Sequence, residues 1–132
     1  MMTMDKAQLI IAAAIAKAKE IGQPMNIAVV DAGTNLAAFA RMDGAWLGSI
    51  DIAINKAFTA KSFDISTREL GRNSQPRDQF FGIHVSNGGR VMIFAGGIPI
   101  KVKGQIVGAV GISGGSGEQD QAVAEAAAAA WT

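Results

Sequence analysis

The sequence predicts an α+β fold in which helices pack on a mainly antiparallel sheet of about five strands. Three observations support this class. Apolar residues recur with helical spacing near both ends of the chain, apolar runs of strand length lie between them, and tight turns join those runs where a parallel sheet would need crossovers. A chain of 132 residues can build one core, so we expect a single domain over residues 1–132.

The first 42 residues predict a helix followed by a hairpin. Apolar side chains recur with helical spacing over Ala7–Ile21, and Thr3 is placed to cap the helix start. Two apolar runs, Met25–Ala32 and Leu36–Met42, then flank the turn Gly33–Asn35 and are typical of a β-hairpin. The first of these strands is apolar on both faces, so we expect it inside the sheet.

Residues 49–71 predict two more helices. Ser49 is expected to open the first of them, with Asp51 in its first turn, where a carboxylate complements the helix dipole. The stretch Ser66–Glu69 reads "STRE", a capping-box pattern, and starts a short helix that Gly71 is expected to end. A polar loop follows.

The remaining elements are three strands and a final helix. The strands are expected over Arg90–Phe94, Pro99–Val102 and Gln105–Ser113, with Lys103-Gly104 as the tight turn between the last two. A helix capped at its start should then run over residues 116–131.

The glycine-rich segment Gly111–Asp120, "GISGGSGEQD", runs from a strand into a helix, an arrangement that can present backbone N–H groups to an anion. It lacks the lysine of a phosphate-binding P-loop and the spacing of a dinucleotide site. Ser116 with Gln119 forms a capping box, so the segment is either simply a well-capped helix start or the edge of a pocket.

Composition restricts the partners. Hydrophobic residues make up 49% and charged residues only 17%, which favours a homo-oligomer whose subunits cover part of each other's surface. The 12 basic residues are scattered, so we expect no nucleic-acid partner. No export signal and no apolar run of about 18 to 20 residues is present, so we expect a cytoplasmic protein without a membrane span.

Metal chemistry within one subunit has few candidate ligands. The chain has no cysteine, which excludes disulfides and thiolate sites, and His84 is its one histidine. No spacing of acids matches a calcium or magnesium loop, so we expect no metal site built from protein ligands alone.

Two basic residues are candidate ligand anchors. Arg41, at a strand end, either pairs with an acid such as Asp31 or Asp43, or binds a carboxylate ligand through its guanidinium fork. Lys56 lies off the centre of the apolar stripe of its helix and is expected to face a neighbouring strand or subunit.

Three residues are candidates for acid–base work. Asp31, Asp43 and His84 could transfer protons, although nothing in the sequence places them within hydrogen-bond reach of one another. His84 is either a hydrogen-bonded structural group, a proton-transfer residue or an iron ligand.

Four segments are distinctive: "VVDAGTNLAAFARMDGA" (29–45), "NKAFTAKSF" (55–63), "GGIPI" (96–100) and "GQIVGAVGISGG" (104–115). Together they resemble the GlcG/HbpS family, which includes the C-terminal domain of PduO-type corrinoid adenosyltransferases. The resemblance covers essentially the whole chain in the expected order. The residues that match the family blocks are Asp31, Arg41, Asp43, Gly44, Lys56, Gly96, Gly97, Pro99, Ser113, Gly114 and Gly115.

The resemblance implies a profilin-like α-β-α domain that assembles into dimers and larger oligomers such as tetramers or octamers. It also implies a small-molecule ligand, haem or a corrinoid, for some members. His84 lies outside the matching blocks, and Met25, Met42 and Met92 are weaker alternatives as iron ligands.

Three functions follow as hypotheses. The first is a ligand-binding protein, with haem or a corrinoid as candidate ligands, that is accessory to a catabolic pathway. Its polar anchors would be Arg41, Lys56 and the N–H groups of Gly114 and Gly115. The glycine-lined sheet edge around Gly96, Gly97 and Pro99 would form the wall of its site. The second is a cofactor-independent enzyme that acts on an organic acid or an aromatic-degradation intermediate, with Arg41 and Lys56 as a carboxylate clamp. The third is an oligomeric scaffold without a ligand.

Overall fold

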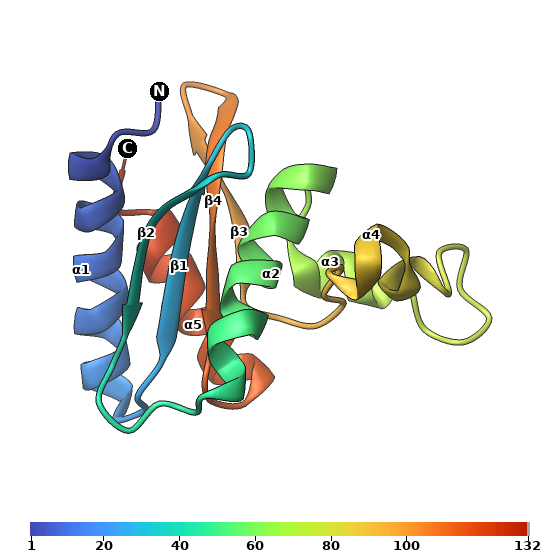
Figure 1. Ribbon diagram of the computed structural model, residues 1–132, viewed down its shortest axis with the longest axis horizontal. Helices are drawn as coiled ribbons and strands as arrows, with labels where there is room; N and C mark the ends of the chain where they lie inside the picture. The colour runs from blue at the N-terminus through green and yellow to red at the C-terminus, as the bar shows by residue number, and fades with distance from the viewer. Residues whose placement is uncertain (132) are drawn as a thin grey trace.

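The computed structural model describes residues 1–131 and contains a four-stranded antiparallel sheet with helices on both faces (Figure 1). The strand order is β2-β1-β4-β3, and all three strand pairs are antiparallel. In chain order the elements are α1 (Met4–Ile21), β1 (Asn26–Asp31), β2 (Leu36–Arg41), α2 (Gly48–Phe63), α3 (Thr67–Arg72), the 3₁₀ turn η1 (Ile83–Val85), α4 (Ser86–Gly89), β3 (Gly97–Val102), β4 (Gln105–Ser113) and α5 (Gly117–Ala128).

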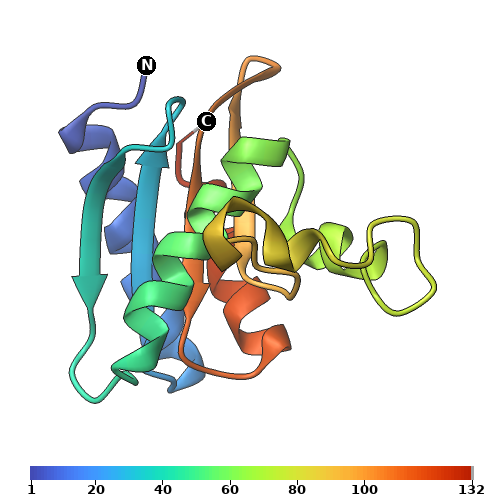
Figure 2. The ribbon, with the colours of Figure 1, turned by 45° about the vertical axis from the view of Figure 1, so that its right-hand side comes forward.

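Three layers enclose two apolar cores. Helices α1 and α5 pack together on one face of the sheet, and α2 crosses the other face (Figures 1 and 2). Side chains such as Ile27 and Val29 of β1 point into the first core, and Ala28 and Val30 point into the second. Strand β1 is therefore buried on both sides, as its apolar sequence predicted, and the α+β class is confirmed.

Three predicted helix caps are confirmed. The side chains of Thr3, Ser66 and Ser116 each accept a backbone N–H at the start of α1, α3 and α5. The other boundaries differ slightly from the prediction. Helix α2 begins at Gly48 without a side-chain cap, and α5 ends at Ala128 rather than at Trp131.

The prediction of a fifth strand over Arg90–Phe94 is wrong. This segment is irregular, and its backbone bonds to the Thr59 side chain of α2 instead of to a neighbouring strand. Thr59 Oγ1 accepts a 2.9 Å hydrogen bond from the Met92 N–H and lies 3.3 Å from the Arg90 carbonyl oxygen. An apolar run alone did not distinguish a strand from a segment whose backbone is bonded to a helix.

Residues 73–95 form a lobe that projects beside α2 and α3, away from the sheet (Figures 1 and 2). The predicted polar loop is its first part. Its path depends on five residues with left-handed backbone: Arg77, Gly82, Asn87, Gly88 and Gly89. The lobe contacts the body through the buried Val91 side chain and the hydrogen bond from Met92 to Thr59, and several of its large apolar side chains are exposed.

No helix within residues 1–131 is long and apolar enough to cross a membrane.

Glycine at two positions permits close contact between neighbouring backbone segments. A Cβ atom at Gly111 of β4 would overlap the carbonyl oxygen of Ala53 on α2. A Cβ atom at Gly71 would likewise overlap the Ile93 carbonyl oxygen, and α3 continues through Gly71 to Arg72. Gly71 is therefore a close-approach residue and not, as we had expected, the helix end.

Replacement of Gly111 by alanine should destabilise the domain by about 1–3 kcal/mol, because the added methyl group forces α2 away from β4. Urea unfolding monitored by circular dichroism measures the change. Gly48→Ala is the matched control: its Cβ would meet nothing within 4 Å, and alanine favours the helix, so stability should stay equal or rise by up to about 1 kcal/mol. Equal losses in both variants would contradict the role assigned to Gly111.

Candidate functional site

The family-like glycine blocks converge on a buried ion pair between Lys56 of α2 and Asp120 of α5. Lys56 Nζ lies 2.9 Å from Asp120 Oδ2 and also donates to the Ile112 carbonyl oxygen at 2.8 Å. The Lys56 side chain is fully buried, and its ammonium lies 4.5 Å from the centre of the Phe94 ring. The pair thus connects the helices of both faces to β4.

Both charged side chains of this pair are buried, and removing a charge from water costs free energy. Burial raises the pKa of the Asp120 carboxyl, while the Lys56 ammonium and the N–H of Gly115 oppose that rise. Burial lowers the pKa of Lys56, and Asp120 opposes that change. Because each charge is compensated mainly by the other, loss of either partner leaves a charge buried without its counterion.

Gly96 and Gly97 make room for the ion pair. Gly96 has a left-handed φ of 122°, and a Cβ there would lie 2.5 Å from the Ile112 carbonyl oxygen and 2.8 Å from Lys56 Nζ. A Cβ at Gly97 would lie 2.6 Å from the Lys56 carbonyl oxygen. The Gly97 N–H donates a 2.9 Å hydrogen bond to Thr67 Oγ1. In this structure the backbone at the start of β3 therefore packs against protein atoms.

The second glycine block continues the same packing. Gly115 donates its N–H to Asp120 Oδ1 at 2.9 Å, and the Gly114 carbonyl oxygen accepts a 2.9 Å bond from Gln23 Nε2. Ser113 is buried at the end of β4, opposite Asn26. Pro99 lies in the edge strand β3, where a missing N–H is tolerated.

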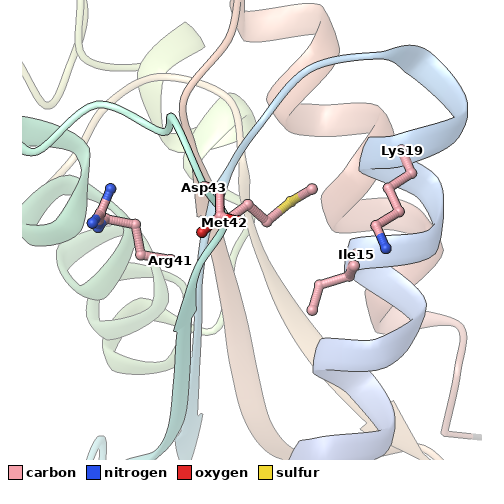
Figure 3. A pocket seen from close by; sticks show the side chains of 5 residues that line it. All are labelled: Ile15, Lys19, Arg41, Met42 and Asp43. Atoms are coloured by element: carbon pink, nitrogen blue, oxygen red, sulfur yellow. The ribbon is translucent and has the colours of Figure 1, made fainter.

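Arg41 and Asp43 lie at an open groove of about 410 Å³ that Ile15, Lys19 and Met42 also line (Figure 3). The Arg41 guanidinium points away from Lys19 in this view, and its Nη1 reaches the Ala45 carbonyl oxygen at 3.4 Å. The expected clamp of Arg41 with Lys56 is not assembled, because Lys56 is enclosed by its own partners.

Asp31 stabilises the turn between β1 and β2. Its Oδ1 accepts 2.9 Å hydrogen bonds from the N–H groups of Gly33 and Asn35. Asp31 is the last residue of β1, next to that turn, whereas Asp43 follows β2 at the opposite end of the hairpin. Six residues of strand, about 20 Å, separate the two carboxylates.

His84 lies in η1, on the lobe, apart from both acids. Its ring contacts the Phe81 ring edge-to-face, with 5.8 Å between ring centres. The Nδ1 atom is buried and has no hydrogen-bond partner within residues 1–131. Asp31, Asp43 and His84 therefore occupy three separate places and do not form one acid–base site.

The fold and these blocks define a class of small α+β domains, and comparison with known proteins identifies it. Residues 2–129 match the family described as haem degrading protein HbpS-like. The chain is 42% identical, over 95% of its length and 88% of the relative's, to an uncharacterized 15.0 kDa protein in the dhaT-dhaS intergenic region of Citrobacter freundii. This chain belongs to the HbpS-like family.

Comparison with solved structures supports the same family. Klebsiella pneumoniae protein ORFY superposes with a TM-score of 0.95 at 40% identity, covering 98% of this chain and 89% of that one. The PduOC:heme complex superposes with a TM-score of 0.93 at 33% identity, covering 98% of this chain and 94% of that one. Corrinoid adenosyltransferase PduO of Citrobacter freundii is 39% identical over 89% of this chain, which spans 35% of that enzyme.

The sequence did not reveal Asp120 as the partner of Lys56. An acid in the first turn of a helix is adequately explained by the helix dipole, so its pairing gave no separate signal. The informative signal was a lysine next to an apolar helix stripe, which requires a buried counterion somewhere in the chain.

Replacement of Lys56 by methionine should cost about 3–5 kcal/mol of unfolding free energy, because Asp120 then remains buried without its counterion. The double variant Lys56→Met with Asp120→Leu should recover most of the loss, as measured by urea unfolding of the four proteins of a double-mutant cycle. Lys61→Met, which breaks a surface pair with Asp64, should change stability by less than about 1 kcal/mol. Additive losses for the two buried positions would contradict the coupling.

Proposed function

We propose that this protein binds haem at the lobe, with His84 as the axial ligand of the iron. The observation that carries the proposal is the imidazole with a buried and unpartnered Nδ1. A buried polar atom without a hydrogen-bond partner destabilises a folded protein. The cost is removed if ligand binding lets the imidazole ring move or brings the atom a partner. Histidine is also a common haem ligand.

The surroundings of His84 suit a flat apolar ligand. Phe80, Phe81 and Val85 are 46%, 59% and 72% exposed, and Phe94 at the base of the lobe is 46% exposed. Large apolar side chains gathered on one projecting segment typically mark a binding surface. A tetrapyrrole would cover them, and its bound metal would supply the redox or ligand-binding chemistry.

Relatives support this choice of ligand. The PduOC structure with 33% identity is a complex with heme, and the family description names haem. A corrinoid is the alternative, because PduO is a corrinoid adenosyltransferase and imidazole also ligates cobalt. We further propose an accessory role in a catabolic pathway, which the resemblance to the GlcG/HbpS family suggests.

The glycine blocks take a structural part in this proposal. Lys56, Gly96, Gly97 and Gly115 pack around the ion pair, so we place the ligand at the lobe instead of at the glycine-lined start of β3. A cofactor-independent enzyme gains no support, because the candidate proton-transfer groups are dispersed.

Titration of the apoprotein with hemin should shift the Soret band with an end point near one equivalent per subunit. His84→Ala should remove the shift, and added imidazole should restore it by occupying the vacated ligand position. Met92→Leu is the control for a sulfur ligand and should leave the spectrum unchanged. A His84→Ala spectrum identical to that of the wild type would disprove ligation by His84, and tighter binding of cobalamin than of hemin would favour the corrinoid.

We also expect a homo-oligomer. Trp46 and Leu47, in the connection from β2 to α2, are 64% and 72% exposed, in a chain with only 17% charged residues. Light scattering coupled to size exclusion should give a mass of at least two subunits. Trp46→Glu with Leu47→Glu should lower that mass if this connection lies in an interface, whereas a wild-type mass of 13.6 kDa would contradict oligomerisation.

A further inference from the structure

Arg90 is the arginine of the lobe that the structure holds in place without neutralising its charge. Its guanidinium carbon lies 3.9 Å from the centre of the Phe58 ring on α2. Its Nε donates a 3.1 Å hydrogen bond to the Asn87 carbonyl oxygen. Within residues 1–131 no carboxylate forms a salt bridge with Arg90, although the side chain is exposed to solvent.

Other arginines differ in one of these respects. Arg68 and Arg72 already pair with carboxylates, at 3.7 Å from Glu125 and 3.2 Å from Glu69. Arg77 is exposed on the same lobe, but no aromatic ring of residues 1–131 stacks on it. Only Arg90 among these combines a fixed guanidinium plane with an uncompensated charge.

These two contacts hold the Arg90 guanidinium in an orientation suited to bind a carboxylate. Stacking on Phe58 and the Nε hydrogen bond orient the guanidinium, and its two terminal amino groups form no hydrogen bond or salt bridge within residues 1–131. A side chain that is already ordered loses less conformational entropy when it binds. The charge is therefore positioned for an anion that comes from outside the subunit's own side chains.

Arg90 is also close to His84 along the chain. The short α4 lies between them, and the left-handed residues Asn87, Gly88 and Gly89 turn the backbone there. The exposed apolar side chains of the lobe, an imidazole and a carboxylate-binding arginine thus belong to one folded segment. A flat apolar ring with a central metal and carboxylates on one edge matches all three features.

We propose that Arg90 binds a propionate carboxylate of the tetrapyrrole and thereby selects tetrapyrroles with free carboxylates. The inference rests on the proposed function above. It also makes Arg90 a specificity-determining residue, because the peripheral carboxyl groups of cobalamin are amides and offer no charge to a guanidinium.

The test compares hemin with its dimethyl ester, in which both propionates are neutral. Apoprotein of the wild type, Arg90→Gln, Arg90→Lys and the control Arg77→Gln is titrated with each porphyrin, and circular dichroism checks the fold of each variant. Arg90→Gln should weaken hemin binding about tenfold or more and leave ester binding nearly unchanged. The hemin affinity of Arg90→Lys should lie between those of the wild type and Arg90→Gln, since lysine keeps the charge without the guanidinium fork. Arg77→Gln should bind hemin as tightly as the wild type.

The spectra separate the two proposals. Arg90→Gln should keep the wild-type Soret position when saturated, because His84 still ligates the iron. Equal affinity of the wild type for hemin and the ester, or an equal loss of both in Arg90→Gln, would overturn the role of Arg90 while leaving haem binding intact. A wild type that binds neither porphyrin would overturn both proposals.

Discussion

The ion pair between Lys56 and Asp120 is the constraint on which the arrangement of the layers depends. The lysine comes from the helix on one face of the sheet and the aspartate from a helix on the other, and both are buried. Charges out of water must be paired at close range, so the two helical layers have to meet beside the start of β3. This contact determines where α2 and α5 lie relative to β4.

The need for space around that pair explains much of the glycine content. At Gly96 a side chain would overlap the ammonium group itself, and at Gly97 it would overlap the backbone of α2. The motif "GGIPI" is thus explained by packing, before any ligand is considered. A residue pattern shared within a family can mark the structural support of the domain and need not mark a binding surface.

Local chemistry determined how much could be predicted from the sequence. Caps such as Ser116 and turns such as Lys103-Gly104 act within a few residues, and the sequence located them correctly. Arg90–Phe94 was assigned to a strand because its bonding partner, Thr59, lies 31 to 33 residues away along the chain. The candidate site was more difficult to predict from the sequence. The pairing of Lys56 with Asp120 and the stacking of Arg90 on Phe58 depend on contacts between elements that are distant along the chain.

The lobe is one continuous stretch, residues 73–95, whose path is set by left-handed residues and by hydrogen bonds to α2. Most of its side chains contribute nothing to the two cores. Mutations can therefore accumulate in its exposed part, residues 75–89, without repacking the sheet, whereas Val91 is buried and Phe94 contacts the Lys56 ammonium. For a ligand held by this segment, as proposed above, substitutions confined to its exposed part would change what is recognised while the layers of the scaffold stay as they are.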